Sequence, residues 1–120
     1  MNIPRRKPLT ANVGIIGVGL DTYWAQFDGL LDEMMGKLSQ FESKVAANSV
    51  AVSNFGMIDN AEAAYSNIGA MKAADLDLLF VDMVTYATSA TFGVLVRELT
   101  CPIVLVALQP LSAMPYAKAT

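Results

Sequence analysis

Apolar residues along the chain form short continuous runs, separated by longer stretches in which they recur at helical spacing. A short continuous apolar run is typical of a strand that is buried on both faces of a sheet. The runs predict four strands, at residues 12–18, 49–55, 77–84 and 102–108. Gly56 is expected to end the second strand. Pro102 suits the first position of the fourth strand because proline has no N–H to donate to a ladder.

The longest stretch between two runs, residues 22–46, predicts a single amphipathic helix. Its apolar residues recur every three or four positions, so they lie on one helical face. That face carries Phe27, Leu31, Met34, Leu38, Phe41 and Val45, and Leu30 and Met35 widen it.

Two further helices are expected, at residues 59–74 and at residues 88 or 89 to 99. Asp59 is expected to cap the earlier of these helices, with Glu62 three positions later, because a carboxylate can accept hydrogen bonds from the free N–H groups at a helix start.

Strands that alternate with helices predict an α/β fold with a parallel sheet. We expect three layers (αβα), a flavodoxin-like strand order of 2-1-3-4, and a single domain over residues 12–116. Residues 1–11 are expected to form a flexible basic tail, and residues 117–120 a ragged C-terminal end. No helix and no fifth strand follow the fourth predicted strand, so the domain is expected to be truncated.

Composition and charge exclude several functions. The net charge is −3, and three of the eight basic residues are Arg5, Arg6 and Lys7, so the rest of the chain is acidic and unsuited to nucleic acid. The absence of histidine removes Ser-His-Asp and Cys-His catalysis. Cys101 is the one cysteine, which excludes an internal disulfide and fits a reducing cytoplasm. No apolar run approaches the roughly 20 residues of a membrane span.

Polar residues follow each predicted strand, where an open α/β sheet binds its ligands. Such a rim could hydrogen-bond sugar hydroxyls, or it could be ordinary capping and loop chemistry. It comprises Gly17, Gly19, Asp21, Thr22 and Tyr23; Asn54, Phe55 and Asp59; Asp82, Thr85, Tyr86, Thr88 and Ser89; and Gln109.

The same residues give weaker support to a dinucleotide site, a phospho-receiver site and a cation site. Gly17 and Gly19 match two of three glycines in a dinucleotide fingerprint, but Asp21 would repel the pyrophosphate. Asp82 stands where a phospho-receiver domain carries its aspartate, without the acidic pair and lysine that such a domain needs. A hard cation could be held by Asp21, Asp59 and Asp82 together, but each of them also has an ordinary role in a loop or cap. Trp24, in the first turn of the long predicted helix, suits a sugar ring, a neighbouring subunit or simple burial.

Four segments together resemble the N-terminal domain of the L-arabinose isomerase and L-fucose isomerase superfamily, over about residues 12–116. They are Ile15–Leu30, Gly56–Ala63, Asp77–Ser89 and Pro102–Gln109. The resemblance implies a metal-dependent aldose–ketose isomerase, an intramolecular oxidoreductase. Its divalent cation, manganese, would be bound by glutamates and histidines of domains that follow this one.

By this resemblance, the chain is a substrate-rim and oligomerisation domain that is not catalytic alone and carries no metal ligand or cofactor. Asp21, Thr22, Tyr23 and Gln109 would bind the sugar in a homo-oligomer, beside the missing downstream domains. The first turn departs from the Gln-His-Leu-Tyr run of true arabinose isomerases, and Val84 replaces a histidine, so arabinose as the substrate is in doubt. The alternative is a self-contained flavodoxin-like module that binds a sugar or nucleotide.

Overall fold

The computed structural model describes residues 10–85 and 89–107, which form a four-stranded parallel sheet with helices on both faces. The strand order is β2-β1-β3-β4, as predicted for a flavodoxin-like fold. The strands are β1 (Asn12–Val18), β2 (Ala51–Ile58), β3 (Leu78–Met83) and β4 (Ile103–Val106). Residues 1–9 of the predicted tail, residues 108–116 of the predicted domain and the predicted C-terminal end at residues 117–120 lie outside the described residues.

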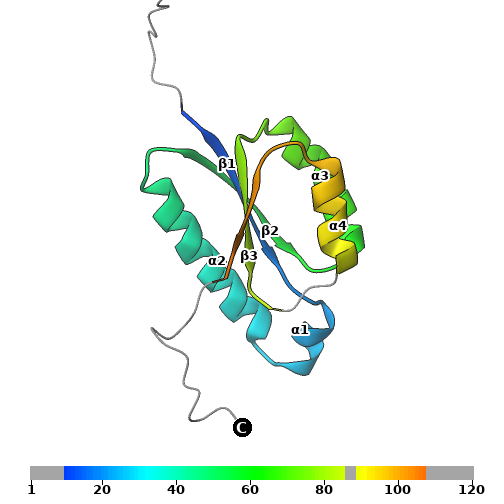
Figure 1. Ribbon diagram of the computed structural model, residues 1–120. Helices are drawn as coiled ribbons and strands as arrows, with labels where there is room; N and C mark the ends of the chain where they lie inside the picture. The colour runs from blue at the N-terminus through cyan, green and yellow to red at the C-terminus, as the bar shows by residue number, and fades with distance from the viewer. Residues whose placement is uncertain (1–9, 86–88, 108–120) are drawn as a thin grey trace, which may run out of the picture.

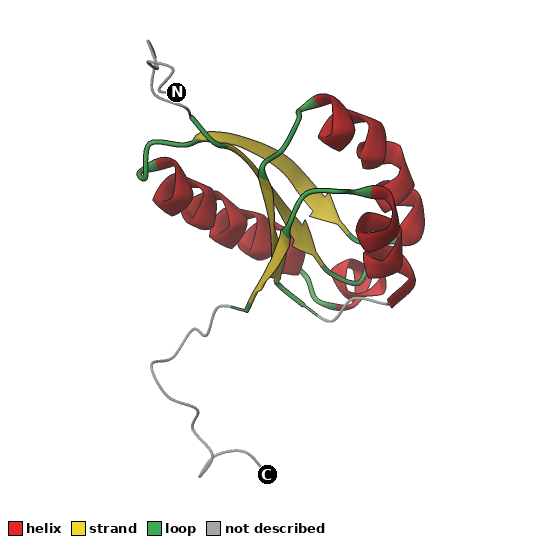
Figure 2. Ribbon diagram, turned by 45° about the horizontal axis from the view of Figure 1, so that its top comes forward, coloured by secondary structure: helices red, strands yellow, loops and turns green. Residues whose placement is uncertain are grey.

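Helices cover the two faces of the sheet unequally (Figures 1 and 2). α2 (Leu30–Ala46) packs on one face, over β1 and β2. α3 (Ala61–Ala73) and α4 (Ser89–Glu98) pack against each other on the opposite face. β1 lies between the two helical layers, and for this reason its residues from Val13 onward are all buried.

Alternate residues of β1 and β3 supply the two halves of the core, because successive strand residues point to opposite faces. Ile16 and Val18 of β1 join Leu79 and Val81 of β3 in the layer beneath α3 and α4. On the other face, the α2 ring of Phe41 meets Phe80 edge-on, with the ring centroids 5.5 Å apart.

The predicted helix over residues 22–46 is wrong in one respect: it is two helices. α1 (Thr22–Gln26) ends at Phe27, whose backbone is extended, and α2 begins after Gly29. Gly29 has φ +77°, a left-handed conformation that glycine adopts without steric cost. Phe27 therefore leaves the predicted apolar face and is 54% exposed, and its ring packs edge-on against Tyr23.

The prediction that β2 stops at Gly56 is also wrong, since the strand continues through it to Ile58. Ile15 pairs with Asn54 and Gly17 pairs with Met57, so β2 carries one extra residue in this interval. This is a β-bulge, and Gly56 permits it with φ +84°. The Asn54 side chain stabilises the bulge by accepting from the Gly56 N–H at 2.8 Å and donating to Glu42 of α2 at 3.0 Å.

The predicted cap of α3 is displaced by one residue. Asn60, rather than Asp59, is the N-cap, and its side chain accepts a hydrogen bond from the Ala63 N–H at 2.7 Å. The fourth strand is shorter than predicted, with four residues, and Leu108 lies outside the described part of the chain.

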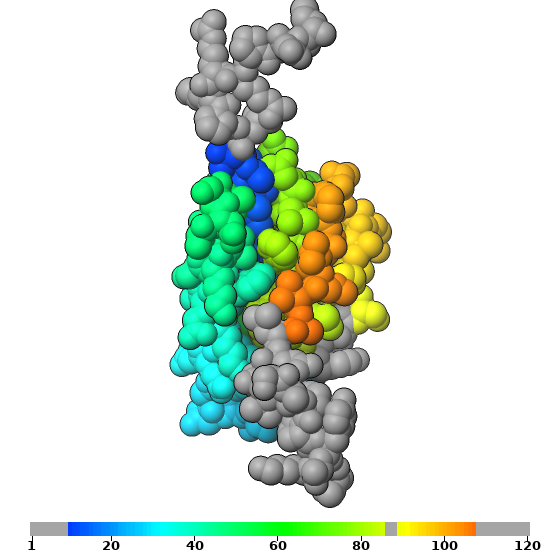
Figure 3. Space-filling model, turned by 60° about the vertical axis from the view of Figure 1, so that its left-hand side comes forward, coloured from blue at the N-terminus to red at the C-terminus, as the bar shows by residue number. Residues whose placement is uncertain are grey.

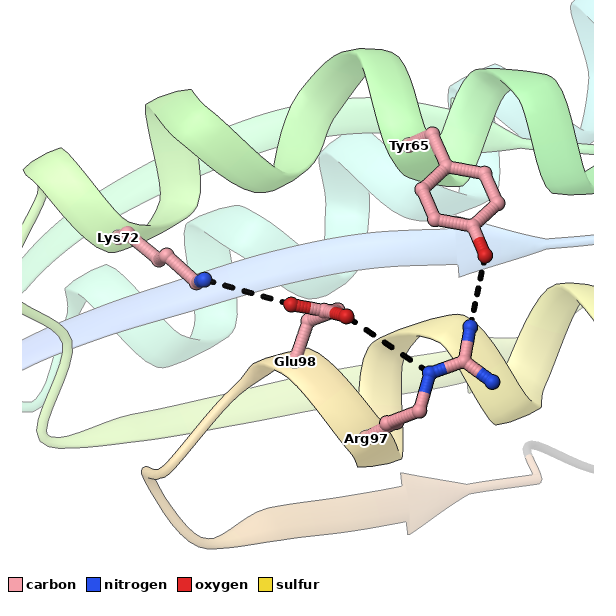
Figure 4. Close-up of polar contacts among 4 residues, drawn as sticks. All are labelled: Tyr65, Lys72, Arg97 and Glu98. Carbon is pink, nitrogen blue, oxygen red and sulfur yellow. Dashed lines mark hydrogen bonds and ion pairs between the residues drawn. The ribbon is translucent and has the colours of Figure 1, made fainter.

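An exposed polar bridge joins α3 to α4 on their outer side (Figure 4). Lys72 lies 3.4 Å from Glu98, and Arg97 donates to the Tyr65 hydroxyl at 2.7 Å. Ion pairs this exposed contribute little to stability. The buried contact between the helices therefore provides most of their attachment.

β4 is the edge strand of the described sheet and is poorly covered. Its residues Val104 and Leu105 point to opposite faces and are 40% and 53% exposed. β4 and α2 are both visible on the surface shown in Figure 3. The main strand contacts of α2 are with β2 and β1.

We expect neighbouring residues of α2 to differ sharply in their effect on stability. Leu38→Ala removes a fully buried side chain and should cost about 2–4 kcal/mol of unfolding free energy. Met35→Ala is the matched control, because Met35 is 37% exposed, and it should cost less than about 1 kcal/mol. Urea denaturation of both variants measures the difference. Equal losses would contradict this packing of α2.

Candidate functional site

The predicted sugar contacts that the structure describes, Asp21, Thr22 and Tyr23, lie at the carboxyl end of β1, on the turn into α1. Asp21 and Thr22 are exposed, and Tyr23 is half-buried. The Tyr23 ring packs edge-on against exposed Phe27, with the centroids 6.0 Å apart. The predicted rim residues Tyr86, Thr88 and Gln109 lie outside the described residues, so Gln109 remains a prediction.

Backbone hydrogen bonds hold the turn after β1 from two sides. On one side, the N–H of Gly19 donates to the Ile58 carbonyl at 3.4 Å, and the N–H of Asp21 donates to the Asp59 carbonyl at 3.2 Å. On the other side, the N–H of Leu20 donates to the Thr85 hydroxyl oxygen at 3.2 Å. The turn is thus attached to the segments that follow β2 and β3, and we call it the clasped turn (residues 19–24).

Two side-chain hydrogen bonds reinforce the clasped turn on its β2 side. The Trp24 indole N–H donates to Asp59 Oδ2 at 2.8 Å, and Asn60 Nδ2 donates to Asp21 Oδ2 at 3.0 Å. Asp59, which the sequence predicts as a cap, instead positions the tryptophan. Asp21 keeps an exposed carboxylate that one amide already orients.

Gly19 is required for packing within this turn. A Cβ at Gly19 would lie 2.8 Å from Thr85 Oγ1 and 3.0 Å from the Trp24 ring. The space beside this glycine is therefore filled by the protein itself. This favours the interpretation of Gly17 and Gly19 as a tight strand-to-helix turn over the dinucleotide fingerprint. The helix that would face the pyrophosphate, α1, is also short, with five residues.

Asp82 differs from the other acidic residues because it is 1% exposed. Its Oδ2 is buried and has no hydrogen-bond partner within residues 10–85 and 89–107. Burial raises the pKa of the Asp82 carboxyl above its usual value, and the positive charge of Lys37 opposes that rise. A phospho-receiver aspartate must be reachable by its phosphate donor, so this burial is unfavourable for that interpretation.

The structure does not assemble a metal site from the acidic residues. Within residues 10–85 and 89–107, no group of three or more acidic or cysteine side chains could hold a metal ion. Asp21 and Asp59 instead hold Asn60 and Trp24, and Asp82 is buried.

A cavity of about 260 Å³, which the sequence did not predict, lies where α3 and α4 end and β3 and β4 begin. Its lining includes Lys72, Asp75, Glu98, Thr100 and half-buried Cys101. This is the amino end of the parallel sheet, opposite the clasped turn. Ligands of open α/β sheets bind at the carboxyl end, so the clasped turn is the stronger candidate.

Comparisons with known proteins identify no relative: no family model matches the chain, and no curated protein or solved structure matches it significantly. None of the described helices is both long and apolar enough to cross a membrane.

Substitution of Gly19 tests the geometry of the clasped turn. Gly19→Ala forces Trp24 or Thr85 to move and should cost about 1–3 kcal/mol of unfolding free energy. It should also shift the emission of Trp24, the chain's single tryptophan. Gly69→Ala is the control, since a Cβ there meets nothing within 4 Å and alanine favours the helix, so stability should stay equal or rise. A neutral Gly19→Ala would refute the close approach.

Proposed function

We propose that the chain is the N-terminal, substrate-rim and oligomerisation domain of a metal-dependent aldose–ketose isomerase-like protein, and that it is not catalytic alone. The clasped turn is the observation that carries this proposal. It presents Asp21, Thr22 and the Tyr23–Phe27 ring pair at the carboxyl edge of the sheet. A carboxylate and a hydroxyl suit sugar hydroxyl groups, and exposed aromatic faces suit the apolar face of a sugar ring.

The preorganisation of this surface supports a binding role. Thr85, Asp59 and Asn60 hold the turn before any ligand arrives. A ligand that meets an ordered surface loses less free energy to ordering than one that meets a loose loop. The resemblance of the sequence to the isomerase superfamily supplies the substrate class, and Gln109 is proposed as a further contact.

In this proposal, the chemistry belongs to parts of the protein other than this chain. Proton transfer between C1 and C2 of a sugar needs a metal or acid–base pair beside the substrate, and the manganese ion would be bound by glutamates and histidines of downstream domains. The rim would complete the site of a neighbouring subunit in a cytoplasmic homo-oligomer. The chain's own residues would position the sugar.

The second candidate is a self-contained module that binds a sugar or nucleotide. The favouring observation is that the end of β2 and the residues that follow β2 and β3 already hold the clasped turn. Such a module would bind its ligand as a monomer.

A titration with L-arabinose and L-fucose, followed by amide chemical shifts, tests the proposed rim. We expect shifts at Thr22 and Tyr23. Tyr23→Ala should weaken binding about fivefold to tenfold, as expected for loss of about 1 kcal/mol of aromatic contact. Tyr65→Ala is the matched control, since Tyr65 is an exposed tyrosine on α3, and it should bind as the wild type does.

The oligomeric state in the same samples separates the two candidates. Binding that appears only in an oligomer, or only when the downstream domains are present, supports the isomerase domain. Binding by a monomer supports the module. No shift at Thr22 or Tyr23 in either state would refute the rim.

A further inference from the structure

A buried acid, Asp82, lies at the end of β3, three residues before Thr85, which accepts a hydrogen bond from the clasped turn. Asp82 is the penultimate residue of β3 and pairs with Gly17 of β1 and Val106 of β4. Paired residues of parallel neighbours share a face of the sheet. A Cβ at Gly17 would meet Met57 and Leu38, so this is the face that α2 covers. Asp82 therefore projects into an apolar layer.

The surroundings of Asp82 offer its carboxylate little compensation. Gly17 has no side chain, and Val106 is apolar. Oδ2 has no hydrogen-bond partner in the part of the chain that the structure describes. An unpaired buried charge is costly, whereas a protonated carboxyl is neutral and loses much less on burial. The folded layer thus favours the protonated acid.

The residues that follow Asp82 are hydrogen-bonded to the end of β1 and to the clasped turn. The N–H of Val84 donates to the Val18 carbonyl at 3.2 Å and to the Asp82 carbonyl at 3.0 Å. The next residue, Thr85, accepts from Leu20. Asp82 is therefore three residues along the chain from Thr85, which accepts a hydrogen bond from the turn that presents Asp21 and Tyr23.

We propose that Asp82 is a proton-dependent latch: its protonated side chain lets the end of β3 close against α2 and hold the clasped turn, and its ionisation loosens both. The proposal depends on contacts beneath the turn and not on sugar binding. It can therefore hold or fail independently of the proposed function.

Among the described residues, Lys37 is the charged group that acts on Asp82. From α2, Lys37 acts on the carboxyl and favours its ionised form. Lys37 is itself paired with Glu33 at 3.7 Å and is exposed, so solvent screens its charge. From β1 and β4, the paired residues Gly17 and Val106 carry no charge. Desolvation by burial outweighs Lys37, and the pKa of Asp82 is raised.

The sign of the pH dependence follows from this direction. A folded-state pKa above the unfolded value means that the native state binds the proton more tightly. The resulting stability is complete below the ordinary aspartate pKa of about 3.9 and is lost as pH rises through the folded-state pKa. Other carboxylates also titrate in this range, so the measured quantity is the difference between the wild type and Asp82→Asn, which stays neutral.

Urea denaturation from pH 4 to pH 9 tests the latch. Between the unfolded-state and folded-state pKa values of Asp82, the folding equilibrium constant of the wild type should fall by about tenfold per pH unit relative to that of Asp82→Asn. Above the folded-state pKa, the ratio of the two constants should no longer change with pH. Asp28→Asn is the charge-matched control on the exposed segment between α1 and α2, and it should parallel the wild type. A ratio that is constant or rises with pH would overturn the proposal.

Trp24 emission reports whether the carboxyl is coupled to the turn. In the wild type, it should titrate with the midpoint of the Asp82 carboxyl, read directly from its ¹³C shift. In Asp82→Asn, that transition should disappear. An Asp82 midpoint at or below about 3.9 would overturn the latch even if the variant does not fold. Trp24 emission that ignores the Asp82 titration would also overturn it.

Discussion

The burial of β1 between two helical layers is the constraint on which the rest of the structure depends. β1 pairs with β2 on one side and β3 on the other, so its backbone is satisfied along both edges. Glycines let side chains from each layer approach it closely. A Cβ at Gly14 would lie 2.7 Å from Leu76, and one at Gly17 would lie 3.2 Å from Met57. The close packing on both faces therefore fixes the position of β1, and with it the start of the turn that follows.

The clasped turn extends this constraint from the core to the surface. Thr85 on one side and Asp59 on the other fix residues that would otherwise form a loose connection between β1 and α1. Trp24 fills the space that Gly19 leaves. The polar residues of the turn consequently have two roles: some of their atoms hold the turn, and the remaining atoms face solvent. A rim built in this way is ordered without a ligand, which is what a positioning surface requires.

The two halves of the sheet differ in how well they are protected. α2 covers β1 and β2, whereas β4 presents Val104 and Leu105 to solvent on opposite faces. Asp82 lies between these two regions, on the face of α2 but in the strand next to the edge. An acid in this position is buried by a layer of limited extent. Its protonation state can therefore affect how firmly the end of β3 closes.

The sequence by itself determined the order of the elements, the parallel sheet and the strand order, because continuous apolar runs and helical spacing reflect burial directly. It also placed Asp21, Thr22 and Tyr23 at the carboxyl edge. Only the tertiary structure decided the break at Gly29, the bulge at Gly56 and the shift of the cap to Asn60. The physical reason is that these features depend on which partner each group meets. Hydrophobic periodicity records which residues are buried, but it does not record that Asp59 meets Trp24 or that Asp82 Oδ2 meets no hydrogen-bond donor among the described residues.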